Sequence, residues 1–69
     1  MTKQEKELVK KIEAVMARKK IEGNPEDFYS VEKKSTNNYE GKVEVGNVFI
    51  TTKGKDIKST IKQLSKELK

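Results

Sequence analysis

The chain has 69 residues, of which 39% are charged and only 32% apolar, and its formal net charge is +5. A chain of this length supports one hydrophobic core, so we expect residues 1–69 to form a single small domain. It contains neither cysteine nor histidine, which excludes disulfides, thiolate metal sites and histidine-based catalysis. We therefore expect a protein that is not an enzyme, with no metal, no cofactor and no small-molecule substrate.

The hydropathy of the chain bears on its location. No apolar run approaches the roughly 18 residues that a membrane-spanning helix needs. The first residues are amphipathic and mixed in charge, unlike a signal peptide. These features predict a cytoplasmic protein that does not associate with a membrane.

The segment between Thr2 and Gly23 carries the signals of an amphipathic helix. Thr2 and Glu5 have the spacing of a capping box, while Gly23 and Pro25 predict the end of the helix. Five apolar residues recur at helical spacing on one face: Leu8, Val9, Ile12, Val15 and Met16. The basic residues of this segment are scattered among glutamates, so we interpret them as a solvated surface.

From residue 28 onward the apolar period changes to two, which is typical of half-buried strands. Gly46-Asn47 predicts a two-residue hairpin turn, because both residue types tolerate positive φ. Residues 28–33 predict a further strand, joined to the hairpin through a polar loop at 35–38. The hairpin register places four apolar side chains on one face: Val43, Val45, Val48 and Ile50.

Phe49 falls on the opposite face of this hairpin. An exposed aromatic side chain of this kind serves as a contact between two copies, as a contact with a chain terminus or as a platform for a nucleic acid base. Phe49 is therefore a candidate interface residue, and the oligomeric state stays open.

After Gly54 the period returns to 3.6, with Asp56 in the position of an N-cap. Four apolar residues form the expected buried face of this second helix: Ile57, Ile61, Leu64 and Leu68. The element order is α-β-β-β-α. An antiparallel sheet can bury one face beneath two helices, so we expect a two-layer α+β domain with both helices packed on one face of a three-stranded sheet.

Most of the excess positive charge falls in residues 53–69, where six lysines face only two acidic residues. On a helical wheel, five of these lysines gather on one flank of the apolar face: Lys55, Lys58, Lys62, Lys66 and Lys69. Lysines four residues apart repel each other by a few tenths of a kcal/mol per pair. A phosphate backbone or an acidic protein surface would neutralise them, and simple solvation of an exposed helix is the remaining explanation.

Residues 28–66 resemble the second half of a double-stranded RNA-binding domain. The similarity lies in Tyr39–Gly46, in the run Gly54-Lys55-Asp56-Ile57-Lys58 and in Ile61. The resemblance implies an α-β-β-β-α fold and a last helix that grips phosphates through a Lys-Lys-x-Ala-Lys motif. Lys55 and Lys58 match the second and third lysines of that motif, and Gly54 stands in place of the first. The minor-groove loop of the family is replaced here by residues 35–38.

The same element order also resembles the HicA-type small ribonuclease toxins. Those toxins depend on a histidine, and this chain has none. The resemblance therefore does not extend to nuclease activity.

These observations lead to two functional hypotheses. The first is a nucleic-acid-binding module that contacts the phosphates of duplex RNA or DNA with low sequence specificity. Its candidate contact residues are Lys53, Lys55, Lys58, Lys62 and Lys66, with Asn37 and Asn38 as a second point of contact. The second hypothesis is a small regulatory or inhibitory protein, from a phage or another mobile element, that binds an acidic protein through its basic helix or its open sheet face.

Overall fold

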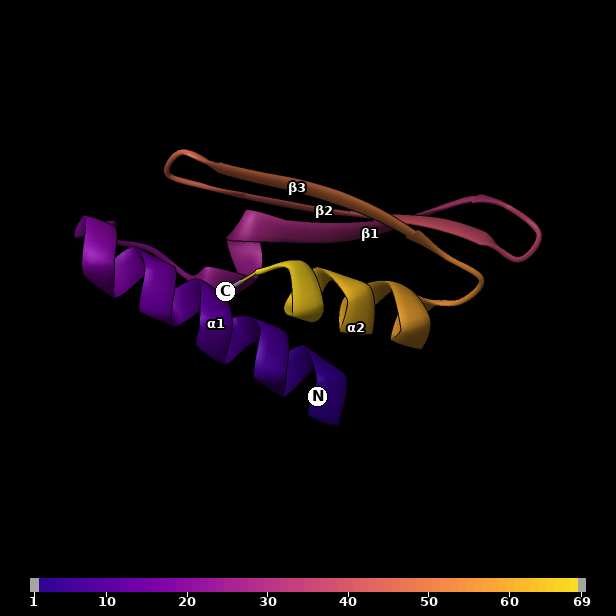
Figure 1. Ribbon diagram of the computed structural model, residues 1–69, viewed down its shortest axis with the longest axis horizontal. Helices are drawn as coiled ribbons and strands as arrows, with labels where there is room; N and C mark the ends of the chain where they lie inside the picture. The colour runs from indigo at the N-terminus through magenta and orange to yellow at the C-terminus, as the bar shows by residue number, and fades with distance from the viewer. Residues whose placement is uncertain (1, 69) are drawn as a thin grey trace.

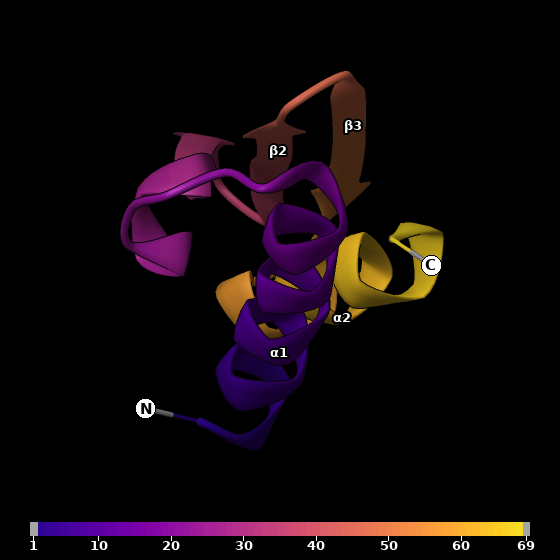
Figure 2. The ribbon, with the colours of Figure 1, turned by 90° about the vertical axis from the view of Figure 1, so that its left-hand side faces the viewer.

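The computed structural model describes residues 2–68 and has the order α-β-β-β-α, with one short 3-10 helix added (Figure 1). The elements are α1 (Lys3–Lys19), η1 (Pro25–Phe28), β1 (Tyr29–Ser35), β2 (Asn38–Val45), β3 (Val48–Gly54) and α2 (Ile57–Glu67). The strands form one antiparallel sheet in the order β1-β2-β3, and both helices lie on the same side of it (Figures 1 and 2). The predicted two-layer α+β architecture is confirmed.

The start of α1 follows the capping signal, but its end does not follow the expected one. Thr2 Oγ1 accepts a hydrogen bond from the Glu5 N–H and donates one to Glu5 Oε1, each at 3.2 Å. The helix stops at Lys19, and Lys20 takes a left-handed conformation with φ 54°. The Ile21 N–H then donates to the Met16 carbonyl oxygen at 2.9 Å, and the Ile21 side chain packs against the core. The expectation that the helix runs to Gly23 was wrong, because ending earlier brings Ile21 inward.

Both hairpins of the sheet close through two-residue turns. The Gly46-Asn47 turn pairs Val45 with Val48, as expected, and Gly46 has φ 58°. The β1–β2 connection is tighter than the predicted polar loop, because Ser35 pairs with Asn38 across a turn that contains Asn37 at φ 57°. A register irregularity between residues 33 and 35 bends the end of β1.

Helix α2 approaches the sheet most closely at two glycines. A Cβ atom added to Gly41 would lie 2.7 Å from Thr60 Cγ2, and one added to Gly54 would meet the backbone of Thr60 at 2.9 Å. Thr60 is fully buried here, whereas Ile57, expected on the buried face, is 52% exposed. The expectation for Ile57 was wrong, since the glycines draw the Thr60 side of the helix onto the sheet and leave Ile57 at the corner after β3.

The core lies between the sheet and the two helices. Its buried apolar side chains are Leu8, Ile12, Val15, Met16, Val43, Val45, Ile61, Leu64 and Leu68. The molecule is elongated along the strands, with principal extents of 38 × 22 × 18 Å. Within residues 2–68, no helix has both the length and the apolar character needed to cross a membrane.

Candidate nucleic-acid interface

Capping and packing together set the orientation of α2. Asp56 Oδ1 accepts a hydrogen bond from the Ser59 N–H at 2.7 Å, which fixes the first turn. Thr60 and Leu64 face the sheet, and the Ser65 carbonyl faces α1. The lysines lie on the exposed arc of the helix, which they share with Gln63 and Glu67. We call them the α2 lysine row: Lys55, just before the helix, and Lys58, Lys62 and Lys66 within it, all exposed.

The α2 lysine row has no ion pair with a carboxylate within 4.0 Å in the described part of the chain. Its close acidic neighbour is Asp56. The hydrogen bond from Ser59 holds the pKa of Asp56 below its ordinary value, and the positive charges of Lys55 and Lys58 add to this effect. Lys69, which the helical wheel places with this row, lies outside the described residues.

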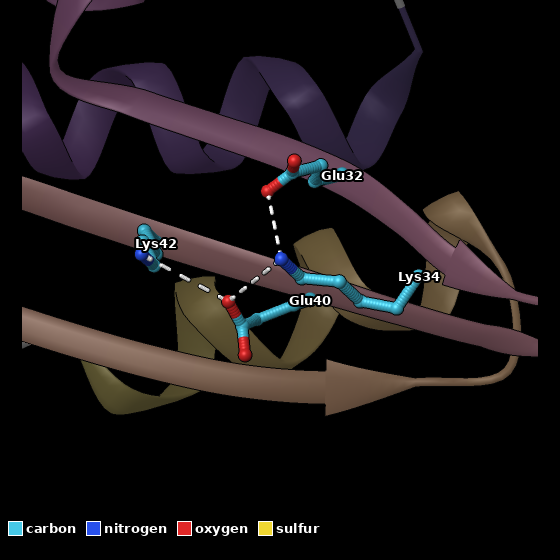
Figure 3. A network of polar contacts seen from close by, with 4 residues as sticks. All are labelled: Glu32, Lys34, Glu40 and Lys42. Carbon is cyan, nitrogen blue, oxygen red and sulfur yellow. Dashed lines mark ion pairs between the residues drawn. The ribbon is translucent and has the colours of Figure 1, made fainter.

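On the face of the sheet opposite the helices, lysines and glutamates form ion pairs. On the face of the sheet away from the helices, the open sheet face, Lys34 Nζ lies 3.1 Å from Glu32 Oε2 and 3.9 Å from Glu40 Oε1 (Figure 3). Lys42 Nζ also lies 3.9 Å from Glu40 Oε1. The hydrogen bond to Glu32, followed by the charges of Glu32 and Glu40, raises the pKa of Lys34. These pairs neutralise one another, so this face presents little net charge.

The structure separates Lys53 from the other candidate lysines. Val43 and Ile50 pair on the helix side of the sheet, so alternate residues of β3 point to the open sheet face. Lys53 is one of these and lies opposite Glu40. The thickness of the sheet therefore lies between Lys53 and the α2 lysine row. Strand alternation alone predicts this placement, but the sequence interpretation grouped Lys53 with the helix.

The two asparagine candidates and Phe49 also belong to the sheet layer. Asn37 and Asn38 are exposed at the β1–β2 turn, which projects at one end of the molecule (Figure 1). Phe49 is 72% exposed and pairs in register with Glu44. It lies at the start of β3, next to the β2–β3 turn. The structure does not gather these residues into one site with the α2 lysine row.

The sequence interpretation did not predict that α1 packs against α2. Helix α1 lies beside α2 in the layer below the sheet (Figure 2), and Lys11 Nζ donates a hydrogen bond to the Ser65 carbonyl oxygen. This contact holds α1 against the last turn of α2. Periodicity within α1 carries no signal for this arrangement, because the contact spans 54 residues of sequence.

One shallow hollow of about 430 Å³ lies where η1 meets the sheet. Its lining is Asp27, Phe28, Tyr29, Ser30, Lys42 and Glu44. Burial, followed by the charges of Glu5 and Glu26, raises the pKa of Tyr29. Acidic, basic and apolar groups are mixed here, and the hollow does not include any of the α2 lysine row. No group of three or more acidic side chains positioned to hold a metal ion occurs within residues 2–68.

These features define a small α+β domain with a basic helical surface and a charge-compensated sheet surface. Comparisons with protein-family models, with curated proteins and with solved structures found no match to this chain.

Proposed function

We propose that this protein is a non-catalytic nucleic-acid-binding module that contacts phosphates through the α2 lysine row. One observation carries the proposal: these four exposed lysines have no carboxylate partner within 4.0 Å among the described residues, whereas Lys34 and Lys42 of the sheet do. Repulsion within the row persists in the free protein and is relieved by a polyanion. The absence of cysteine supports a cytoplasmic site of action.

The spacing of the row suits a repeating anion. Lys58, Lys62 and Lys66 recur every four residues, which places them about 6 Å apart along the helix axis. Lysine reaches phosphate as a point charge on a flexible stem and does not read base edges, so sequence specificity is low. Four phosphate contacts on B-DNA give a slope of log affinity against log salt of about −3.6.

A binding titration with matched variants tests the proposal. Fluorescence anisotropy with labelled duplex DNA, duplex RNA and single strands is measured at several salt concentrations. Lys58→Gln with Lys62→Gln removes two charges from α2, and Lys42→Gln with Lys53→Gln removes two charges from the open sheet face. The α2 variant is expected to bind more weakly and to lose about two units of salt slope, while the sheet variant keeps most of the affinity.

Two results would overturn the proposal. The first is the absence of binding to any nucleic acid at low salt. The second is an equal loss in the two variants, which would point to net charge alone. An acidic protein as the true partner corresponds to the first result, since the row would then recognise a particular arrangement of carboxylates.

A further inference from the structure

The hollow beside η1 lies at a step between two strands of the sheet. Tyr29, the first residue of β1, pairs with Val43, so Glu44 and Val45 of β2 extend beyond the start of β1. The residues of η1 come just before β1 and flank this step. We call the space between them and the sheet the η1 hollow.

The lining of the η1 hollow combines carboxylates with an aromatic side chain. Asp27 and Phe28 come from η1, and Glu44 comes from β2. Glu44 alternates with the buried Val43 and Val45, so it belongs to the open sheet face. The volume of about 430 Å³ falls within the range of about 300–1,000 Å³ that is usual for ligand pockets.

The η1 hollow has an excess of negative charge. Within residues 2–68, Asp27 and Glu44 have no lysine or arginine nitrogen within 4.0 Å. Lys42, the basic residue among the lining residues, directs its Nζ toward Glu40 Oε1 at 3.9 Å (Figure 3). A cation in the hollow would therefore meet two carboxylates that the fold leaves unpaired.

Further carboxylates lie close to the hollow. Tyr29, which also lines it, has a raised pKa because of burial and because of the charges of Glu5 and Glu26. Negative charge therefore gathers at this end of the molecule, although the chain as a whole carries a net charge of +5.

The residues of the hollow suit an organic cation better than a metal ion. Calcium takes roughly six to eight oxygen ligands, and two carboxylates supply few of them. A guanidinium group carries several N–H donors in one plane, pairs with carboxylates and stacks on aromatic rings. Asp27 and Glu44 offer the carboxylates, and Phe28 offers the ring.

We propose that the η1 hollow binds a guanidinium group, with Asp27 and Glu44 accepting its hydrogen bonds and Phe28 stacking against it. The group belongs to an arginine side chain of a partner or to a free small molecule, and both are recognised by the same chemistry. The hollow shares no residue with the α2 lysine row, so this site is separate from the proposed phosphate contacts.

A titration followed by heteronuclear NMR of the full chain tests the proposal. The probes are methylguanidinium chloride, a short glycine peptide with one arginine, and the same peptide with lysine in place of arginine. The first two are expected to cause saturable shifts at the amides of Asp27, Phe28 and Glu44, and the lysine peptide is expected to bind more weakly. Tighter binding of the arginine peptide than of methylguanidinium identifies a partner chain as the source of the group, and equal binding identifies the isolated group.

Matched variants separate the hollow from the general charge of the protein. Asp27→Asn with Glu44→Gln is expected to weaken binding by at least about tenfold, because it removes two charged acceptors. Glu13→Gln with Glu67→Gln changes the net charge equally at exposed positions outside the hollow and should bind like the wild type. Circular dichroism checks that both variants are folded.

A third variant tests the aromatic contact. Phe28→Leu keeps an apolar side chain against the core and is expected to weaken binding about two- to fivefold by removing the ring. If this variant does not fold, the carboxylate variants still decide the outcome.

Three results would overturn the proposal. The first is the absence of saturable shifts at the η1 hollow with methylguanidinium or the arginine peptide. The second is an equal loss of binding in the two double variants, which would indicate attraction to net charge alone. The third is a lysine peptide that binds as tightly as the arginine peptide, since the hollow would then not recognise the guanidinium group.

Discussion

Lys11 of α1 donates a hydrogen bond from Nζ to the carbonyl oxygen of Ser65 in the last turn of α2. The last four carbonyl groups of a helix have no partner within that helix. Lys11 satisfies one of them and also places a positive charge at the negative end of the α2 dipole. The contact joins the two helices and so holds α1 against the last turn of α2.

Replacing Lys11 by methionine keeps an apolar stem of similar length and removes the donor and the charge. We expect a loss of about 1–2 kcal/mol in the free energy of unfolding, measured by urea denaturation followed by circular dichroism. The matched control is Lys10→Met on the exposed side of the same helix, which is expected to change stability by less than about 0.5 kcal/mol. Equal effects of the two substitutions would show that the bond to Ser65 contributes nothing.

Gly41 allows α2 to lie close to the sheet. An alanine Cβ at this position would stand 2.7 Å from Thr60 Cγ2 and 2.8 Å from Leu64 Cδ1. We expect Gly41→Ala to destabilise the fold by about 1–3 kcal/mol through overpacking. Adding Thr60→Ser removes the Cγ2 methyl and keeps the hydroxyl, so the double variant should recover part of the loss. Two effects that simply add in a double-mutant cycle would contradict this explanation.

Asp56 makes stability depend on pH in the acid range. Its pKa is lowered in the folded state by the hydrogen bond from Ser59 and by Lys55 and Lys58. A carboxyl group with a depressed folded pKa stabilises the fold above its ordinary pKa, and this contribution is lost as the pH falls through the folded pKa. The wild type should therefore lose stability below the ordinary value of 3.8.

Asparagine at position 56 also caps a helix but does not titrate. Thermal melting of the wild type and Asp56→Asn, from neutral pH to well below 3.8, compares the two caps. The advantage of the wild type over the variant is expected to shrink as the pH falls. An advantage that stays constant through this range would show that Asp56 does not titrate as described.

Phe49 contributes little to the fold, because its side chain is 72% exposed on the open sheet face. Phe49→Ser should change the free energy of unfolding by less than about 0.5 kcal/mol and leave duplex binding intact. The adjacent control Ile50→Ser replaces a side chain that packs against the core, so it should destabilise clearly. If the folded Phe49→Ser variant lost nucleic acid binding, the bases of the nucleic acid would bind the open sheet face, and the proposed contact between phosphates and the α2 lysine row would be wrong.

Sequence reasoning succeeded where the determining interactions are local. The caps at Thr2 and Asp56 depend on residues three positions away, and the Gly46-Asn47 turn depends on its own backbone preference. The strand register then follows, because a period of two leaves a single choice for the buried face. These features follow from the sequence alone.

Prediction failed where a distant contact decided between local alternatives. Helix α1 ends at Lys19 because Ile21 turns inward to the core, although Gly23 offers a good stop. Ile57 is exposed and Thr60 is buried because two glycines on neighbouring strands let α2 tilt its Thr60 side onto the sheet. Helical periodicity gives the breadth of an apolar face but not which edge of it the partner covers.

The sequence by itself determined the order of the elements, their caps and turns, and the clustering of lysines on the second helix. Only the tertiary structure decided which side of α2 lies against the sheet, and that α1 packs against the last turn of α2. The physical reason is range: hydrogen bonds within a few residues are encoded locally, whereas the packing of α1 on α2 joins side chains 54 positions apart.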